Sequence, residues 1–398
     1  MRALGRILAG VALTALTLVA AAILFDWLRY AGLAIATAAA AATLARKLPA
    51  RVLVAAALAI PAAVLLGGWW PRLFAPYGLD DAVIEDLPLG VSATGRPLRP
   101  FLFSWNPATR HLLVTHAHGD DGGSGVTLVD LSEITPRTDY FPGPEEHAHS
   151  ATELAAQATV AVHVSSEAVP RTFLYPLAGD APPIERFETR FAELEASVLD
   201  ARVDTLFLSD LRRQMLGAIS PASFVTGDFS ALAEWRAPFQ NVKQLVLDPE
   251  RGGVVVGRSD LPGRVLRLDA ASGAITTRSL GLYCPAIAIE GRRHELYATQ
   301  TYRNSIAVLD ASTLRVLRRR VIGGWPYDAE PITTRGWIAV GSFIGNRVLF
   351  LDAETLALRA SLGACAKVRS LFFDERDAFL YFGDACGLHR VRLAPPRS

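Results

Sequence analysis

The sequence is poor in the residues on which zinc, haem and nucleic-acid binding depend. Its only cysteines are Cys284, Cys365 and Cys386, and no two of them form a Cys-x-x-Cys pair, so a structural zinc site or c-type haem attachment has no support. Lysine occurs only at Lys47, Lys243 and Lys367, and the net charge is +1. A nucleic-acid partner is therefore not expected, because the chain has no excess of positive charge to neutralise phosphates.

Common catalytic motifs are also missing. The chain has no Gly-x-Ser-x-Gly, no Walker loop, no Gly-x-Gly-x-x-Gly and no His-Glu-x-x-His. Nucleophilic and phosphate chemistry are thus unsupported, and the sequence by itself predicts no cofactor. This favours a non-enzymatic function.

The apolar residues are concentrated at the N-terminus. Stretches 7–25, 30–45 and 52–70 contain no Asp, Glu, His, Lys or Arg, and the first and third approach the length needed to cross a bilayer. No cleavage site followed by a polar segment separates the first stretch from the second. Residues 1–70 are therefore predicted to be a membrane anchor of three transmembrane α-helices in contact with lipid.

Basic residues at the ends of these stretches predict the orientation. They precede the first stretch and separate the second from the third: Arg2, Arg6, Arg46, Lys47 and Arg51. The positive-inside rule places both of these segments in the cytoplasm, so the chain after residue 70 lies outside it. We expect a multi-pass protein of a bacterial inner membrane, with the remainder on the periplasmic side.

A repeat organises the rest of the chain. The segment Leu309-Asp310-Ala311-Ser312-Thr313-Leu314 recurs around Asp269 and around Asp352, at spacings of 41 and 42 residues. Two short, alternating apolar runs precede each aspartate. A period near 40 residues made of short β runs is typical of a propeller blade of four antiparallel strands. An aspartate at the end of a strand suits the start of a turn, where it accepts hydrogen bonds from backbone amides.

Extending this period predicts an all-β, seven-bladed β-propeller over residues 98–398, preceded by a linker at 71–97. In the poorly matching third copy, the run 224–228 falls in phase and is expected to be the third strand of its blade. The seventh copy ends one strand short. Because an open sheet edge would expose unpaired backbone groups, we expect the run 82–86 to close the ring as the outer strand of the last blade.

Two of the copies resemble a known repeat. Residues 296–310, Leu-Tyr-Ala-Thr-Gln-Thr-Tyr-Arg-Asn-Ser-Ile-Ala-Val-Leu-Asp, and residues 338–352 are similar to the repeat of YVTN-type seven-bladed β-propellers, a quinoprotein-like repeat family. The resemblance covers blades four to six well, one and seven partly, and two and three poorly. It implies the fold, but its functions range over surface proteins, partner-binding modules, lactonases and quinoprotein-type enzymes.

Loops that join the second strand to the third, and one blade to the next, are expected at one mouth of the central channel, where propellers usually bind ligands. The residues assigned to this face as a ligand or partner surface are Arg258, Asp260, Tyr302, Arg303, Trp325, Tyr327, Asp328, Lys367, Arg369 and Asp384. Such a mixture of aromatic residues and arginine suits a protein partner or an anionic ligand, and it is also what any exposed loop contains.

Histidines suggest a second chemistry on the same face. His116 and His118 form one His-x-His pair, and His147 and His149 form another in the next blade, with His163, Asp120 and Asp121 nearby in the sequence. Neutral imidazole is a preferred ligand of zinc and other divalent transition metals, so these pairs are candidate metal ligands. The alternative is a polar loop whose histidines bind backbone groups or water.

The cysteines of the seventh blade are expected to lie on this face as well. Cys365 precedes that blade and Cys386 lies in one of its loops, so the two are candidates for a disulfide in a compartment that permits one. Cys284 is expected to be a free thiol.

We therefore expect a membrane-anchored extracytoplasmic propeller that binds a protein or ligand, for example as a subunit of an envelope complex. The alternatives are a metal-dependent hydrolase or lactonase-like enzyme that uses the histidines, and a quinoprotein-like electron-transfer subunit.

Overall fold

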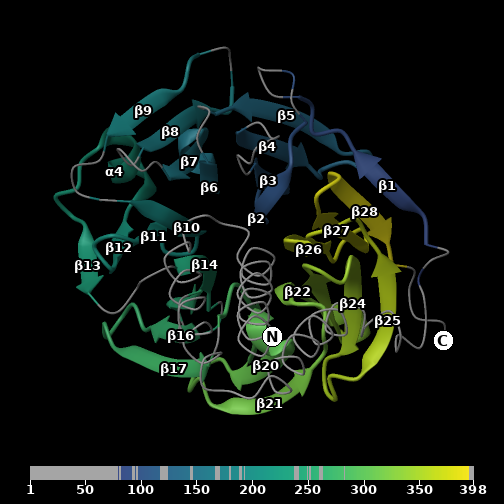
Figure 1. The fold of residues 1–398 in the computed structure, drawn as a ribbon. Helices are drawn as coiled ribbons and strands as arrows, with labels where there is room; N and C mark the ends of the chain where they lie inside the picture. Colours follow the sequence, from purple (N-terminus) through teal and green to yellow (C-terminus); the bar gives the residue numbers. More distant parts are fainter. Residues whose placement is uncertain are drawn as a thin grey trace, which may run out of the picture. The chain divides into compact units, whose positions relative to one another are not determined.

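The computed structural model describes residues 79–393 apart from short gaps at 80–81, 92–94, 96, 117–123, 144–146, 166–170, 179–180, 188–190, 192, 237–241, 249, 251, 260–262 and 282. The described elements belong to one compact unit, residues 70–398. They form seven four-stranded antiparallel sheets set around a central axis, a seven-bladed β-propeller (Figure 1).

In six of the sheets the four strands follow one another in the sequence from the axis outward. The first three sheets consist of β2 (Pro100–Asn106), β3 (His111–His116), β4 (Gly125–Asp130) and β5 (Arg137–Pro142); β6 (His147–Leu154), β7 (Thr159–Ser165), β8 (Arg171–Pro176) and β9 (Ile184–Phe187); and β10 (Leu194–Asp200), β11 (Thr205–Asp210), β12 (Met215–Ile219) and β13 (Ala233–Arg236).

The next three sheets repeat this order and contain the copies with the clear repeat. They consist of β14 (Val242–Leu247), β15 (Val254–Arg258), β16 (Gly263–Leu268) and β17 (Ile275–Gly281); β18 (Ile287–Glu290), β19 (Glu295–Gln300), β20 (Ser305–Asp310) and β21 (Val316–Val321); and β22 (Pro326–Ile332), β23 (Trp337–Ser342), β24 (Arg347–Asp352) and β25 (Leu358–Gly363). Short 3-10 helices connect strands at η2 (Ala155–Gln157), η3 (Thr301–Arg303) and η4 (Thr333–Arg335).

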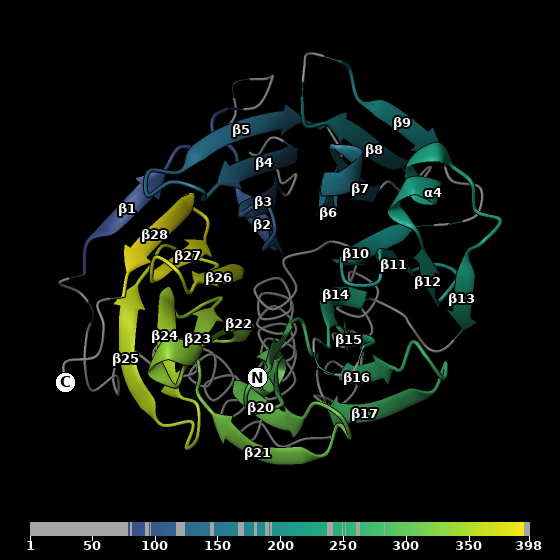
Figure 2. The same cartoon turned by 180° about the vertical axis from the view of Figure 1, so that it is seen from behind.

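The seventh sheet joins the two ends of the described chain. Its inner strands are β26 (Ser370–Asp374), β27 (Phe379–Gly383) and β28 (Leu388–Arg392), and its outer strand is β1 (Ile84–Leu87). β1 runs antiparallel to β28, with Ile84 opposite Val391 and Leu87 opposite Leu388. Figure 2 shows the two segments side by side at the outer edge of the ring. The strand that the sequence places at the ring closure is thus present and pairs where it was expected.

Side chains reinforce this closure. Nδ1 of His389 lies 2.7 Å from the Asp86 carboxylate and its Nε2 lies 3.0 Å from Asp384, while Arg390 pairs with Glu85 at 2.6 Å. Burial lowers the pKa of His389, but the two carboxylates outweigh this effect and the net pKa is raised. Leu89, just after β1, is buried in the core between the seventh and first sheets.

The aspartates of the repeat form the turns after the third strands. The carboxylate of Asp310 accepts hydrogen bonds from the amides of Ser312 and Thr313 at 3.0 and 2.8 Å, and Asp352 does the same for Glu354 and Thr355 at 3.1 and 2.7 Å. The Ser312 hydroxyl, followed by the amide and hydroxyl of Thr313, lowers the pKa of Asp310 to about 2 against the opposing effect of partial burial. These aspartates have a structural role.

The third sheet departs from the sequence prediction. Its third strand is β12, and the run 224–228 falls instead in and just after a helix, α4 (Pro221–Thr226), inserted before β13. The Ser220 hydroxyl caps this helix by accepting the Ser223 amide at 3.1 Å, and Pro221 occupies its first turn. These start signals outweigh the phase of the repeat, so the strand assigned to 224–228 was wrong.

Among the described residues no helix is long and apolar enough to span a bilayer. The three predicted transmembrane helices fall within residues 1–78, outside the part of the chain that the structure describes.

Candidate functional site

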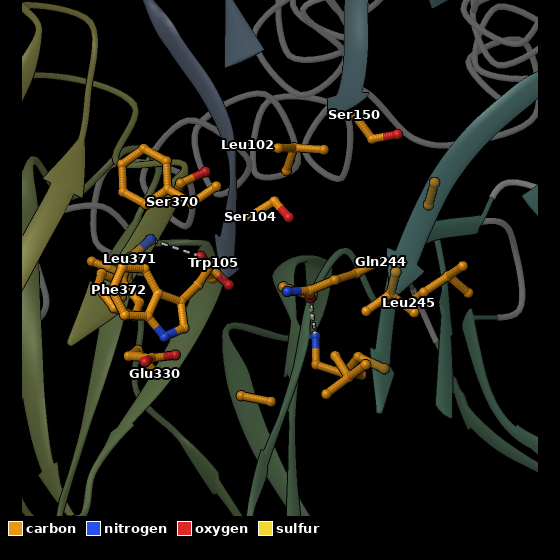
Figure 3. Close-up of a pocket in the computed structure, with 18 of the residues that line it drawn as sticks. Leu102, Ser104, Trp105, Ser150, Gln244, Leu245, Glu330, Ser370, Leu371 and Phe372 are labelled. Atoms are coloured by element: carbon orange, nitrogen blue, oxygen red, sulfur yellow. Dashed lines mark hydrogen bonds between the residues drawn. The ribbon is translucent and has the colours of Figure 1, made fainter. Parts of the chain in front are cut away.

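A cavity of about 380 Å³ lies on the axis of the ring. It is lined by the innermost strand of every sheet: β2, β6, β10, β14, β22 and β26, together with β18 and the residues before it. Figure 3 shows its walls, with Trp105, Leu371 and Phe372 on one side and Gln244 and Leu245 on the other. The lining is mainly apolar with a few polar groups, as is usual in ligand sites.

Polar side chains connect neighbouring inner strands around this cavity. The Gln244 amide oxygen accepts the Ile287 backbone amide at 2.8 Å, the Asp328 carboxylate accepts that of Leu371 at 2.8 Å, and Glu330 accepts that of Phe373 at 3.1 Å. In each case the acceptor belongs to one sheet and the donor to the next. Inner strands of different sheets do not pair through their backbones, so these side chains satisfy amides that would otherwise lack acceptors.

The carboxyl groups of Asp328 and Glu330 beside the cavity both have raised pKa values. Burial raises the pKa of Asp328 to about 7, although the amides of Leu371 and Ala329 oppose the shift. Burial also raises the pKa of Glu330 to about 8, with a further contribution from the charges of Asp328 and Glu375. Sequence reasoning placed Asp328 at the mouth and missed Glu330, since nothing in the repeat marks its burial.

Cationic and aromatic side chains gather at the end of the cavity where the innermost strands begin. Tyr327 stacks on Phe343 with ring centroids 5.4 Å apart, and Nζ of Lys367 and the guanidinium of Arg369 lie 5.9 and 5.5 Å from the Phe343 ring. Arg369 also lies 5.6 Å from the ring of Phe101. Tyr327, Phe101 and Arg369 line the cavity, so the group borders it at this end. We call these residues the mouth cluster: Phe101, Tyr327, Phe343, Lys367 and Arg369.

A second aromatic run lies in loops of the fifth sheet and the start of the sixth. The rings of Tyr283 and Tyr302 are 4.9 Å apart, and Tyr302 meets Trp325 edge-on at 6.3 Å. Tyr302 belongs to η3, between β19 and β20, and Trp325 immediately precedes β22. The structure therefore brings all three predicted aromatic residues of this face, Tyr302, Trp325 and Tyr327, into two groups.

Other predicted residues are not at the surface. Arg258 and Asp384 are each 2% exposed and Trp325 is 5% exposed. The Asp384 carboxylate accepts the amides of Cys365 and Cys386 at 2.9 and 2.8 Å, which gives it a structural role in a loop. Asp260 lies outside the described residues.

The histidines predicted as metal ligands have protein partners. Buried His116 is 2.7 Å from the Thr127 hydroxyl, and His163 lies 3.0 Å from the hydroxyls of both Thr172 and Ser197. Burial lowers the pKa of His116 to about 4 and that of His163 to about 3, so both rings are neutral at pH 7. His149 lies 3.7 Å from a carboxylate oxygen of Glu195.

The described part of these histidine pairs does not form a metal-binding group. Within the described segments, the one set of His, Cys, Asp or Glu side chains with ligand atoms close enough for a metal is Cys365, Asp384 and Cys386. Its two sulfurs are joined in a disulfide, with Cα atoms 5.9 Å apart. His118 and the side chain of His147 lie outside the described residues.

The disulfide also positions the mouth cluster. Lys367 and Arg369 follow Cys365 in the loop before β26, and Cys386 lies in the loop between β27 and β28. The Ala385 amide donates to the Ala366 carbonyl at 2.8 Å, and the Lys367 amide to the Phe343 carbonyl at 3.0 Å. Cys284, by contrast, is a buried free thiol whose pKa burial raises to about 12, which makes it unreactive.

Comparison with known proteins identifies the fold and no family. No protein-family model matches the chain, and no curated protein matches its sequence. Many chains of known structure are similar in fold. One belongs to a structure described as "Crystal Structure of Mitotic Checkpoint Complex"; it has a TM-score of 0.60 and 11% identity over 78% of this chain and 91% of that chain. At this identity the likeness shows the β-propeller fold alone.

Proposed function

We propose that this chain is a membrane-anchored, extracytoplasmic β-propeller that binds a protein partner at the mouth of its channel, as a subunit of an envelope complex. The mouth cluster is the observation that carries the proposal. Tyrosine and arginine are enriched at the energetic centres of protein interfaces, because their large, stiff side chains combine apolar area with hydrogen bonding. Loops with few mobile side chains also bind at a low entropic cost.

The rigidity of this surface supports the same function. The loop carrying Lys367 and Arg369 is held by the disulfide and by backbone hydrogen bonds to two other loops. The apolar N-terminal stretches support the location, since the positive-inside rule puts the propeller outside the cytoplasm. The structural neighbour comes from a structure of a multiprotein complex, which is compatible with a binding role. The hydrolase alternative is not favoured, because the described histidines bind other side chains.

Photo-crosslinking in intact cells tests the binding surface. We expect p-benzoylphenylalanine at position 343 to give a discrete protein adduct, and Lys367→Glu with Arg369→Glu to lower its yield at least fivefold. Position 337 is the matched control, because Trp337 also lies beside a cation, Arg335 at 4.7 Å, but begins β23, whereas Phe343 directly follows the last residue of that strand. Equal yields from positions 337 and 343, or no adduct from 343, would contradict the proposal.

A reporter fused after Ser398 tests the location. If the propeller is extracytoplasmic, a fused alkaline phosphatase is expected to be active, because its disulfides form only outside the cytoplasm. A fused fluorescent protein that needs the cytoplasm to fold should then stay dark. The reverse pattern would refute the membrane orientation and leave the crosslinking result unaffected.

A further inference from the structure

Three arginines lie together where the outer strands of the fourth and fifth sheets meet. Arg278 of β17 is opposite Val265, and Arg319 of β21 is opposite Ala307. Val265 and Ala307 are both buried in the core cluster between these two sheets. Directly paired residues in a sheet project from the same face, so Arg278 and Arg319 both lie on the rim of this interface.

Arg303 reaches the same place from η3. Its guanidinium lies against Gly281, the last residue of β17, so closely that a Cβ added to Gly281 would be 2.8 Å from the Arg303 Cζ. Gly281 also has a φ of +104°, a conformation that other residues rarely adopt. The absence of a side chain at position 281 thus leaves room for the guanidinium. We call Arg278, Arg303 and Arg319 the arginine patch.

The patch has no acidic counterpart within the described residues. Strands β16, β17 and β21 contain no Asp or Glu, and no described carboxylate pairs with any of the three arginines. Other arginines on these strands form ion pairs with carboxylates: Arg318 is 2.7 Å from Glu295, and Arg267 is 3.3 Å from Asp248. All three side chains of the patch are solvent-exposed.

The three like charges repel one another. The pKa of Arg319 is lowered, first by partial burial and then by the charges of Arg303 and Arg278. Like charges in such a position destabilise the folded chain unless an anion binds them. An apolar side chain accompanies them: Val321 is 66% exposed and lies two residues beyond Arg319, on the same face of β21.

We infer that the arginine patch binds an acidic segment of a partner protein, one in which carboxylates are interspersed with apolar residues. Planar guanidinium groups bind carboxylates with two parallel hydrogen bonds, and Val321 supplies an apolar contact beside them. Tyr302, next to Arg303, belongs to the second aromatic run and connects the patch to it. The patch shares no residue with the mouth cluster, so each can be tested without the other.

Fluorescence anisotropy with a labelled peptide tests this inference. The probe is Leu-Glu-Glu-Val-Glu-Glu-Leu, added to the full-length chain in nonionic detergent. We expect saturable binding that weakens at least fivefold between 50 and 300 mM salt, and at least tenfold in the Arg303→Glu, Arg319→Glu double variant. Arg292→Glu with Arg376→Glu is the matched control. These exposed arginines lie in the β18–β19 and β26–β27 hairpins, at the other end of the strands from η3. This control variant should change the affinity less than twofold.

A control peptide with glutamine in place of glutamate should not bind. Equal losses of affinity in the two double variants would overturn the inference, because they would show a general effect of net charge. Unchanged peptide binding by the Arg303→Glu, Arg319→Glu variant, together with its loss of sedimentation on phosphatidylglycerol vesicles, would also overturn it and would assign the patch to lipid. Arg319→Glu alone should leave the thermal unfolding midpoint equal or raised, because it places a carboxylate between two arginines; a clear fall would show that Arg319 is structural.

Discussion

Replacing residues 84–90 with a glycine-serine segment of equal length is expected to lower the midpoint of thermal unfolding by about 8 °C or more. The replacement removes β1, exposes the edge of β28, and takes Leu87 and Leu89 out of the core between the seventh and first sheets. Burial of Leu89 contributes roughly 2 kcal/mol and that of the partly buried Leu87 about 1 kcal/mol. The lost pairing with β28 removes about 1 kcal/mol more, and about 2 °C is lost per kcal/mol in a domain of this size. Calorimetry or circular dichroism measures the shift.

Val83→Ser provides the control for this replacement. Val83 directly precedes β1 but is 76% exposed, so its loss removes no core contact and should shift the midpoint by less than 1 °C. A replacement of residues 84–90 that unfolds at the wild-type temperature would show that the ring is stable without its closing strand.

Glu330→Gln is expected to stabilise the protein at alkaline pH by several degrees and to leave it nearly unchanged at pH 5. Glu330 has a raised pKa of about 8 in the folded chain, chiefly because it is buried beside the cavity. In the unfolded chain the group ionises near pH 4.3. Between these values the unfolded state releases its proton first, so the wild type loses stability as the pH rises from about 4 to about 8. Glutamine retains an oxygen to accept the Phe373 amide and has no charge to bury.

Unfolding midpoints at pH 5 and pH 9 measure this effect. Glu354→Gln makes the same chemical change at an exposed turn and should shift neither midpoint by more than about 1 °C. Asp328→Asn should stabilise less than Glu330→Gln, because the two Asp328 oxygens each accept a backbone amide, from Leu371 and Ala329. Destabilisation by Glu330→Gln at pH 9 would show that the ionised carboxylate is needed there.

The repeat made the architecture predictable. Each blade needs its neighbours in order to bury its faces, so the same strand pattern recurs at a fixed spacing that is visible around Asp269, Asp310 and Asp352. The missing strand of the last copy also pointed to residues 82–86, because a ring with an unpaired edge strand is unfavourable. The third blade escaped this reasoning because Ser220 and Pro221 begin a helix where the period alone predicts a strand.

The candidate site was predictable only in part. Loop positions in the repeat assigned Tyr327, Lys367 and Arg369 to one face, and in the structure these three side chains gather around Phe343. They did not distinguish exposed residues from buried ones such as Arg258, since the same hairpin geometry carries both. Glu330 was overlooked for a related reason. An acidic residue on a strand is expected to be solvent-exposed, and only the structure shows that Glu330 accepts the Phe373 amide of the next sheet.

The sequence by itself determined the number of blades, the strand order of the clearly repeated blades and the segment that closes the ring, because these depend on local periodicity and on the requirement that backbone groups be paired. Only the tertiary structure decided which charges are buried at the channel, which histidines are already bound to hydroxyls, and which three arginines meet at the rim of two sheets. Those arrangements depend on contacts between different blades. The pattern within a single repeat carries no information about which side chains of the neighbouring blade face it.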